Sequence, residues 1–288
     1  MDIKYTQAVE DVTKKFGTSY YFATRFLPAD LKKATYALYG FFRVPDEIVD
    51  NAPGSASTEM ILQELLDWEQ AWEQAYQQHI TPFPILNLTA EVFHTYHIPY
   101  QYSVDFLSAM RQDIMTTRYQ NYEQLKEYMY GSAEVVGLIM SYVIKYTDDK
   151  ALVYARKLGE AMQMTNFLRD IDEDYRQRQR IYMPQDELAT YHITEQMIQD
   201  KVMNNDMKKF MKYQVKKTHY LYQEANKGIQ YLDPRGRFAV TMASRMYEAI
   251  LDKIEQQEYN IFLKRARTSK REKIYLLGKT VLELGGIR

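Results

Sequence analysis

Apolar residues recur at three- and four-residue intervals along most of this chain, the spacing that puts them on one face of a helix. Residues 58–78 show this pattern most clearly. Residues 121–145 are apolar on several sides, which predicts one long helix buried among others. No stretch alternates apolar and polar residues in the manner of a strand. The pattern therefore predicts an all-α chain.

Proline and short polar residues indicate where these helices begin, bend and end. Pro28 lies at a favoured first-turn position of a helix that runs to Asp50, and Pro45 within it predicts a kink. Asp148 is placed to cap a helix that continues to the acidic residues near position 174. Breaks are expected at residues 82–84 and 180–184, and further helices at residues 100–117, 194–227, 233–257 and 268–282.

Length and composition limit the class of protein. At 288 residues without a low-complexity linker, the chain is expected to form one domain over residues 1–288, around a central cavity. The net charge of -1 gives no electrostatic case for nucleic acid as a partner, and the absence of cysteine excludes thiolate metal sites. With no signal-type N-terminus and no long apolar run, we expect a cytoplasmic protein, with peripheral membrane contact left open.

Two short acidic segments each place two aspartates four residues apart: Asp46 and Asp50, then Asp170 and Asp174. Residues at this spacing share one helix face, so each pair holds two like charges about one turn apart. A divalent cation relieves that repulsion, and Mg²⁺ commonly binds one or two carboxylates while a substrate phosphate completes its shell. Two such pairs on facing helices would form a cage for a diphosphate.

Acidic pairs also occur on helices that bind no diphosphate. A solvated helix face is the ordinary interpretation of one acidic pair, but apolar residues such as Val49 and Phe167 flank both pairs here. A di-iron carboxylate bundle needs two Glu-x-x-His units, and the chain has one, Glu91 to His94. Packing accounts for most of the 26 tyrosines, although aromatic faces also stabilise cations.

Five segments surround and include these acids. They are Ser19-Tyr20-Tyr21-Phe22 before Leu27-Pro28, Tyr39 to Asp50, Tyr128-Met129-Tyr130-Gly131 before Val136-Gly137, Leu158 to Asp174, and Arg180-Ile181-Tyr182-Met183-Pro184. In content and order they resemble the squalene and phytoene synthase family, which joins two isoprenoid diphosphates head to head. The resemblance runs almost end to end and is nearest to the bacterial phytoene synthases. It implies an isoprenoid-synthase type of helical bundle.

The resemblance also implies roles for individual residues. Two or three Mg²⁺ ions would be held, together with diphosphate, by Asp46, Asp50, Asp170, Asp174 and Asn166. Substrate would be bound by Ser19, Tyr20, Arg43, Gln163, Asn166, Arg169, Arg180, Tyr182, Tyr247 and Arg265. Tyr130 is the implied catalytic tyrosine, which would shield carbocations and assist the loss of a proton.

The implied reaction has two stages. Loss of one diphosphate gives an allylic cation that the second substrate attacks to form a cyclopropyl diphosphate, and a second ionisation with rearrangement and proton loss gives the linear product. The segment from Arg180 to Leu188 resembles the phytoene synthase branch best. It favours two geranylgeranyl (C20) diphosphates and phytoene, a carotenoid precursor. The alternative is a squalene or dehydrosqualene synthase that uses two farnesyl (C15) diphosphates, with NADPH as a reductant only for squalene.

Two rival classes fit less well. Elongating prenyltransferases and terpene cyclases usually carry Asp-Asp-x-x-Asp motifs, and neither acidic segment contains adjacent aspartates. A non-catalytic scaffold related to these synthases should have lost its metal ligands, whereas all four aspartates remain.

Three features stay open at the level of sequence. Asp113 is either a catalytic acid or the partner of an arginine. Glu134 departs from the small residue usual in the family, so it narrows the tail channel, pairs with a base or faces away from substrate. The basic stretch from Lys264 to Lys273 is a solvated face, a diphosphate contact or a contact with anionic lipid. The sequence gives no indication of the oligomeric state.

Overall fold

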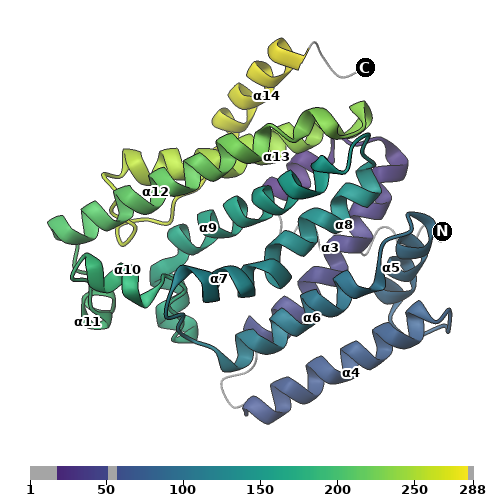
Figure 1. The fold of residues 1–288 in the computed structure, drawn as a ribbon, viewed down its shortest axis with the longest axis horizontal. Coiled ribbons are helices and arrows are strands. Elements are labelled where there is room, and N and C mark those ends of the chain that lie inside the picture. Colours follow the sequence, from purple (N-terminus) through teal and green to yellow (C-terminus); the bar gives the residue numbers. More distant parts are fainter. Residues whose placement is uncertain (1–17, 51–56, 285–288) are drawn as a thin grey trace.

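The structure is a computed structural model that describes residues 18–50 and 57–284. Within these ranges every regular element is a helix (Figure 1), and pairing between extended residues is limited to isolated bridges such as Arg118 with Ile181. The first half contains α2 (Thr18–Thr24), α3 (Ala29–Asp50), α4 (Thr58–Tyr76), α5 (Pro84–Thr95), α6 (Tyr100–Met115), α7 (Tyr122–Met129), the π-helix η1 (Tyr130–Glu134) and α8 (Val135–Ile144). The second half contains α9 (Lys150–Arg178), α10 (Gln185–Thr190), α11 (Glu195–Gln199), α12 (Asn205–Asn226), the 3₁₀ helix η2 (Ile229–Tyr231), α13 (Pro234–Gln256) and α14 (Lys270–Leu284). The all-α expectation is confirmed.

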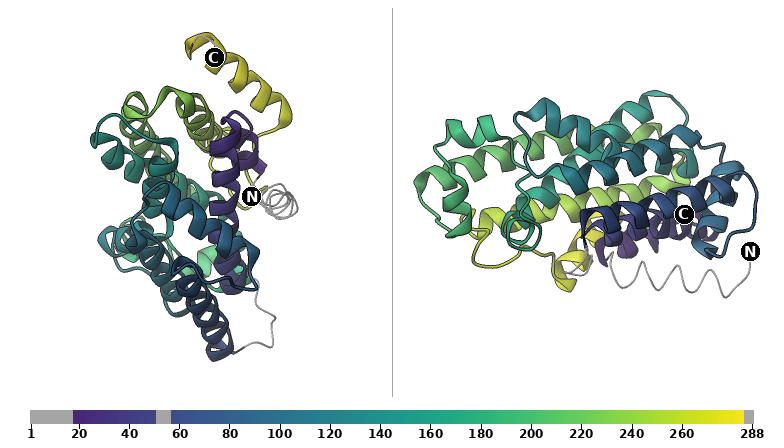
Figure 2. Two further views of the ribbon diagram at one scale, coloured as in Figure 1. Left: turned by 90° about the vertical axis from the view of Figure 1, so that its right-hand side faces the viewer. Right: turned by 90° about the horizontal axis from the view of Figure 1, so that it is seen from below.

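Helix α9 lies at the centre of the bundle. It packs against α12, α8, η1 and α13, while α3 packs against α4, α5, α6 and α8 on the other side of the molecule. Two further views show the long helices lying roughly side by side, with α4 at one edge and α14 at the opposite edge (Figure 2). The central position of α9 explains why apolar residues occur around much of its circumference.

Two glycines let α8 and η1 approach α9 closely. A Cβ atom built on Gly159 would lie 2.5 Å from the carbonyl oxygen of Ala133, and one on Gly137 would lie 2.4 Å from the carbonyl oxygen of Ala155. Both distances are far below van der Waals contact, so a larger side chain at either position would push the helices apart.

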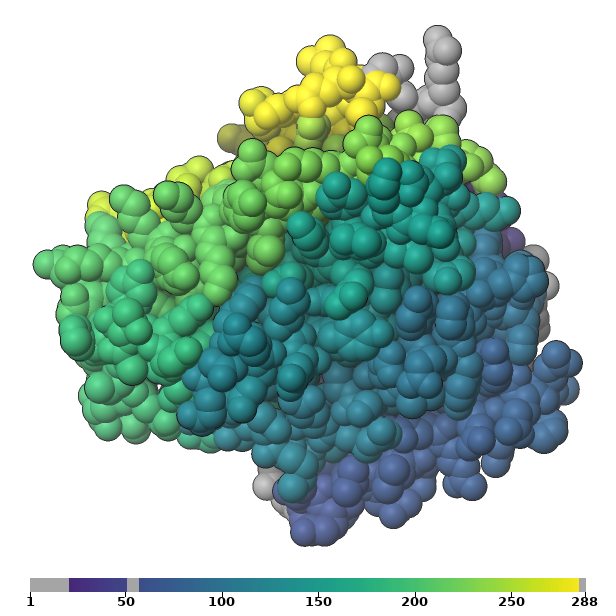
Figure 3. All heavy atoms as spheres, in the orientation of Figure 1, coloured from purple at the N-terminus to yellow at the C-terminus, as the bar shows by residue number. Residues whose placement is uncertain are grey.

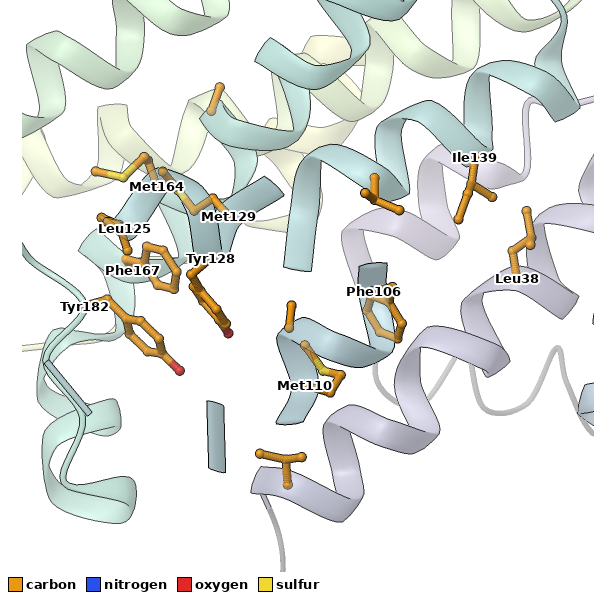
Figure 4. Packing of buried hydrophobic residues seen from close by; sticks show 14 of the residues in the cluster. Leu38, Phe106, Met110, Leu125, Tyr128, Met129, Ile139, Met164, Phe167 and Tyr182 are labelled. Carbon is orange, nitrogen blue, oxygen red and sulfur yellow. The ribbon is translucent and has the colours of Figure 1, made fainter. Parts of the chain in front are cut away.

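Aromatic rings close the core near the end of α9. The rings of Phe167 and Tyr182 stack with centroids 4.1 Å apart, and the ring of Tyr128 lies close to both, 5.8 Å from Tyr182 and 6.4 Å from Phe167 (Figure 4). All three side chains are buried, and they fix the loop after α9 against the helix that precedes it.

The long helix expected over residues 121–145 is present without interruption over residues 122–144, but it is not α-helical throughout. The chain there is α7, then the π-helix η1, then α8. A π-turn widens the helix by about one residue per turn, which apolar periodicity does not reveal.

The ends of the other helices differ less from those expected from the sequence. The segment expected at 194–227 divides into α11 and α12, because Lys201 adopts a positive φ of 56° and Asn204 caps α12. Gln179, with φ 54°, ends α9 where a break was expected. The N-cap residue of α9 is Asp149 and not Asp148 as expected, although the carboxylate of Asp148 accepts a hydrogen bond from the backbone N–H of Lys150 at 2.9 Å. The short helices α5 and α10 had not been expected.

Candidate active site

A cavity of about 820 Å³ lies between α3, α6, α8, α9, α13 and the segment that precedes α14. Its polar end is lined by Arg43, Asp46, Asp50, Asp113, Asn166, Arg169, Asp170, Asp174, Arg178 and Arg265. Its apolar end is lined by Val136, Met140, Ile144, Ala151, Ala155, Leu158, Met162, Leu232 and Ala239. One continuous wall therefore joins a charged region to a hydrocarbon-lined region.

The four expected aspartates meet at the polar end. Asp46 and Asp50 come from the last turns of α3, and Asp170 and Asp174 from the last turns of α9. The four-residue spacing places both members of each pair on the same side of their helix. The sequence-based expectation that the two motifs face one cavity agrees with this geometry.

Arginines hold these carboxylates in the structure. Arg43 forms ion pairs with Asp46 and with Glu47. Asp170 accepts two hydrogen bonds from Arg265, at 2.7 and 2.8 Å, and further hydrogen bonds from its neighbour Arg169. Bidentate pairing of this kind gives strong, oriented contacts between guanidinium and carboxylate groups.

Arg178 joins the two acidic pairs across the cavity. Its Nε lies 3.0 Å from Oδ1 of Asp50 on α3, and its Nη1 lies 3.2 Å from Oδ1 of Asp174 on α9. Arg178 was not among the residues expected from the sequence. Its spacing of four residues from Asp174 was the available signal.

Asp113 belongs to a buried network behind the acids. Its carboxylate lies 2.9 Å from Nη1 of Arg180 and accepts a hydrogen bond of 2.9 Å from the hydroxyl of Tyr182. The same Nη1 of Arg180 donates to Asp50 at 2.6 Å. Of the two sequence-based alternatives for Asp113, the structure has it as the partner of an arginine. Arg180 is buried and connects Asp113 to Asp50 instead of lining the cavity.

The crowding of negative charge appears in the pKa values. Burial, with the charge of Asp170 beside it, raises the pKa of Asp174 to about 8. Burial and the charge of Asp50 raise the pKa of Asp46 to about 7; 39% of the Asp46 side chain is accessible, but it faces the cavity. For Asp170, burial acts in the same direction, but the hydrogen bonds from Arg169 and Arg265 outweigh it and lower the pKa.

Most of the other residues expected to bind substrate line the cavity. Gln163, Asn166, Tyr182 and Tyr247 line the cavity, as expected. Ser19 and Tyr20 fall within α2, but their side chains lie outside the described residues.

Tyr130 does not line the cavity. Its hydroxyl donates a hydrogen bond to Asp105 at 3.2 Å, and the guanidinium of Arg156 lies 5.2 Å from the centre of its ring. The geometry therefore does not place Tyr130 against a substrate, and its catalytic role stays a prediction.

Glu134, which departs from the family pattern, is buried and has a basic partner. Its Oε2 accepts a hydrogen bond of 2.6 Å from Nε of Arg156, and the residue is not part of the cavity wall, although its neighbours Ala133 and Val136 are. Burial raises the pKa of Glu134. Of the three alternatives raised by the sequence, pairing with a base and facing away from the cavity both hold.

The residues at the polar end suit Mg²⁺. They offer carboxylate oxygens, the ligand type that this ion prefers. Burial, and after it the neighbouring carboxylates, raises the pKa values of Asp46 and Asp174, and a bound cation would favour the charged form of both acids. Within the described chain, no three of the four motif aspartates have carboxylate oxygens gathered within 4.8 Å of one another. Arg178 lies between Asp50 and Asp174, so metal binding requires this side chain to move.

A family profile and several relatives match this chain in sequence. The sequence profile described as squalene/phytoene synthase matches residues 13–272. Phytoene synthase 1, chloroplastic, from Arabidopsis thaliana is 34% identical over 289 aligned positions, which cover 96% of this chain and 67% of that protein. A phytoene synthase from Arthrospira platensis is 30% identical, covering 88% of this chain and 85% of that protein.

A solved structure resembles the fold. The crystal structure of a dehydrosqualene synthase in complex with a ligand gives a TM-score of 0.89 at 26% identity, and the match covers 98% of this chain and 97% of that one. No helix within residues 18–50 and 57–284 combines the length and the apolar character needed to cross a bilayer.

Proposed function

Because this chain belongs to the squalene/phytoene synthase family, we propose that it joins two molecules of geranylgeranyl diphosphate head to head and releases phytoene, two diphosphates and two protons. One observation carries the proposal. The acids of α3 and α9 line one end of a cavity whose other end is apolar, so a charged head group and a hydrocarbon tail each find a suitable surface.

The choice of a C20 substrate rests on sequence relatives and on the length of the apolar wall. The named relatives at 30–34% identity are phytoene synthases. Helix α9 lines the cavity from Ala151 to Asp174, and the 19 residues from Ala151 to Asp170 rise by roughly 28 Å along the helix axis. A wall of this length can contact an extended tail of four isoprene units along its whole length.

The basic residues at the polar end can exchange partners when substrate binds. Arg43, Arg169 and Arg265 now neutralise aspartates, and all three line the cavity. A diphosphate offers the same planar, bidentate recognition as a carboxylate with more charge. We infer that these guanidinium groups turn to the diphosphate and stabilise the charge that develops as the carbon–oxygen bond breaks.

The carboxylates freed by this exchange are the ligands for metal. Asp46, Asp50, Asp170 and Asp174 would hold Mg²⁺ with Asn166 beside them, and the ion would supply positive charge to the departing diphosphate. Dependence on Mg²⁺ is part of the proposal.

The apolar wall protects the carbocations from water. Phe42, Phe106 and Phe167 line the cavity together with Tyr247, and their ring faces offer negative electrostatic potential to a passing cation. The aliphatic residues further along α8 and α9 exclude water, which would otherwise capture the allylic cation as an alcohol.

The test is product identification. Purified protein is incubated with Mg²⁺ and either geranylgeranyl or farnesyl diphosphate, with and without NADPH, and hydrocarbons are identified by mass spectrometry. We expect phytoene from the C20 substrate without a reductant. Asp46→Asn and Asp170→Asn should each abolish product while the midpoint of thermal unfolding stays within a few degrees. Near-normal activity in either variant removes that residue from the mechanism.

A second candidate is dehydrosqualene synthesis from two farnesyl diphosphates. The match to the dehydrosqualene synthase structure, with a TM-score of 0.89, favours it. A C30 product from farnesyl diphosphate together with no C40 product would establish this alternative. A product seen only with NADPH would indicate a squalene synthase, and no hydrocarbon from folded protein would indicate the scaffold function.

The low solubility of the proposed product indicates where the enzyme releases it. Phytoene is a C40 hydrocarbon that does not dissolve in water, so we infer that the enzyme releases it at a membrane surface.

A further inference from the structure

Helix α14 projects from the body of the molecule. It packs on α13, where its inner side places Leu276 and Leu277 against a cluster that includes Met242 and Met246. The space-filling view shows α14 standing above the rest of the surface (Figure 3). Among residues 18–50 and 57–284, the contacts of α14 are therefore on one side of the helix.

The opposite side of α14 is apolar and exposed. The side chains of Ile274, Tyr275 and Leu282 are 65%, 70% and 86% exposed. Residues 274, 278 and 282 follow one another at four-residue spacing on one face, and no atom comes within 4 Å of a Cβ built on Gly278. Large apolar residues gathered on one exposed face mark an interaction surface.

Exposed basic residues lie on α14 and in the segment just before it. The side chains of Lys264, Arg267, Lys270, Arg271 and Lys279 form no ion pair with any part of the chain that the structure describes. The acids of the helix are already paired inward: Glu272 with Lys253, and Glu283 with Arg245, both on α13. The charge left on the outer side is therefore positive.

We propose that α14 docks on an anionic lipid surface, with Ile274, Tyr275 and Leu282 in the interface and the basic residues at the head groups. An apolar face flanked by lysine and arginine is the pattern of a helix that lies in the plane of a membrane. A second copy of the chain fits this surface less well, because a two-fold contact through α14 would bring like charges together.

The proposed docking surface lies next to the cavity. Arg267 and Thr268, which lie just before α14, line the cavity. A molecule that leaves past this segment emerges beside the proposed membrane contact. The docking inference goes beyond the proposed reaction, since vesicle binding is measured without turnover and would fail or succeed independently of it.

Co-sedimentation with vesicles tests the inference. Full-length protein is mixed with vesicles of phosphatidylcholine alone or with phosphatidylglycerol added. We expect binding to the anionic vesicles that weakens as NaCl is raised. The double variant Ile274→Glu/Leu282→Glu should lower the partition coefficient by about tenfold or more, since it places acids in the lipid-facing side. Its phytoene synthesis in detergent should equal that of the wild type.

The matched control is Met60→Glu/Ile80→Glu, which changes two residues that are 63% and 96% exposed near α4, away from α14. This control should bind vesicles as the wild type does. Equal losses in both double variants, or no binding of the wild type to anionic vesicles, would overturn the proposal. A concentration-dependent dimer, measured by light scattering and lost only in the α14 variant, would also overturn it by assigning the face to a second copy.

Discussion

Each carboxylate at the polar end of the cavity is engaged by an arginine. Arg178 is the residue that links the two motifs, through Asp50 on one side and Asp174 on the other. A guanidinium group and the proposed Mg²⁺ would neutralise the same charges, so they would compete for these oxygens. We therefore propose that Arg178 is an internal counter-ion of the metal-free site.

Replacing Arg178 by glutamine should strengthen metal binding while it lowers stability. We expect the dissociation constant for Mn²⁺, measured by electron paramagnetic resonance without substrate, to fall about fivefold or more, since the competing cation is removed. The matched control is Arg176→Gln, because Arg176 pairs with Asp172 and does not line the cavity. Unchanged or weaker Mn²⁺ binding by Arg178→Gln would contradict the competition.

The buried pair of Asp113 and Arg180 should contribute strongly to stability. Replacing Asp113 by alanine leaves the Arg180 charge buried with only Asp50 as a partner, so we expect the free energy of unfolding to fall by about 3 kcal/mol in urea denaturation. Tyr182→Phe removes one hydrogen bond to the same carboxylate and should cost about 1 kcal/mol. A smaller loss for Asp113→Ala than for Tyr182→Phe would be inconsistent with this network.

At the scale of helices, we expect the apolar side of α9 to limit the length of the tail that the cavity accepts. Ala155 lines the cavity 15 residues before Asp170, or roughly 22 Å along the helix. Leu158 and Met162 lie nearer to the acids and would contact the middle of the tail.

Ala155→Phe should therefore shorten the usable channel. We expect the ratio of C30 to C40 product, measured with equal amounts of farnesyl and geranylgeranyl diphosphate, to rise about tenfold. An unchanged thermal midpoint serves as the control for overpacking. If the product ratio stays constant in a folded variant, α9 does not limit chain length.

Apolar periodicity predicted most of the long helices because it reports local geometry. It predicted α3, α4, α6 and α9 with small errors at their ends. It missed η1, since the widened turn of a π-helix follows from packing against α6 and α9 and not from the order of residues. The break before α12 depends on the positive φ of Lys201, a residue type that gives no warning of it.

For the whole molecule, the sequence predicted those parts of the site whose residues lie close together in the chain. It did not predict contacts between residues that only folding brings together. The four-residue spacing of Asp170 and Asp174 predicts from the sequence alone that both lie on the same helix face. The contact of Arg265 with Asp170 spans 95 positions and was not predicted, because Arg265 had been expected only to bind diphosphate. The resemblance also implied a role for Tyr130, whose hydroxyl contacts Asp105 and which does not line the cavity, so that role stays a prediction.

The concentration of buried acid predicts how stability depends on pH. The folded protein raises the pKa of Asp174 from 3.8 to about 8, so between these values the folded state binds more protons than the unfolded state. The contribution of Asp174 to stability is therefore largest at low pH and is lost as pH rises towards 8. In metal-free protein, Asp174→Asn should gain thermal stability relative to the wild type between about pH 5 and pH 8. Parallel curves for the two proteins would show that Asp174 ionises normally.

The central claim is that both acidic pairs and the apolar wall of α9 form one site for two prenyl diphosphates. A crystal structure with Mg²⁺ and a thio-analogue of geranylgeranyl diphosphate tests it directly. We expect metal ions bound by Asp46, Asp50, Asp170 and Asp174, diphosphates beside Arg43 and Arg265, and tails running along α9 towards Ala151. Analogue bound elsewhere, with the aspartates still paired to arginines and no ion between them, would contradict the account.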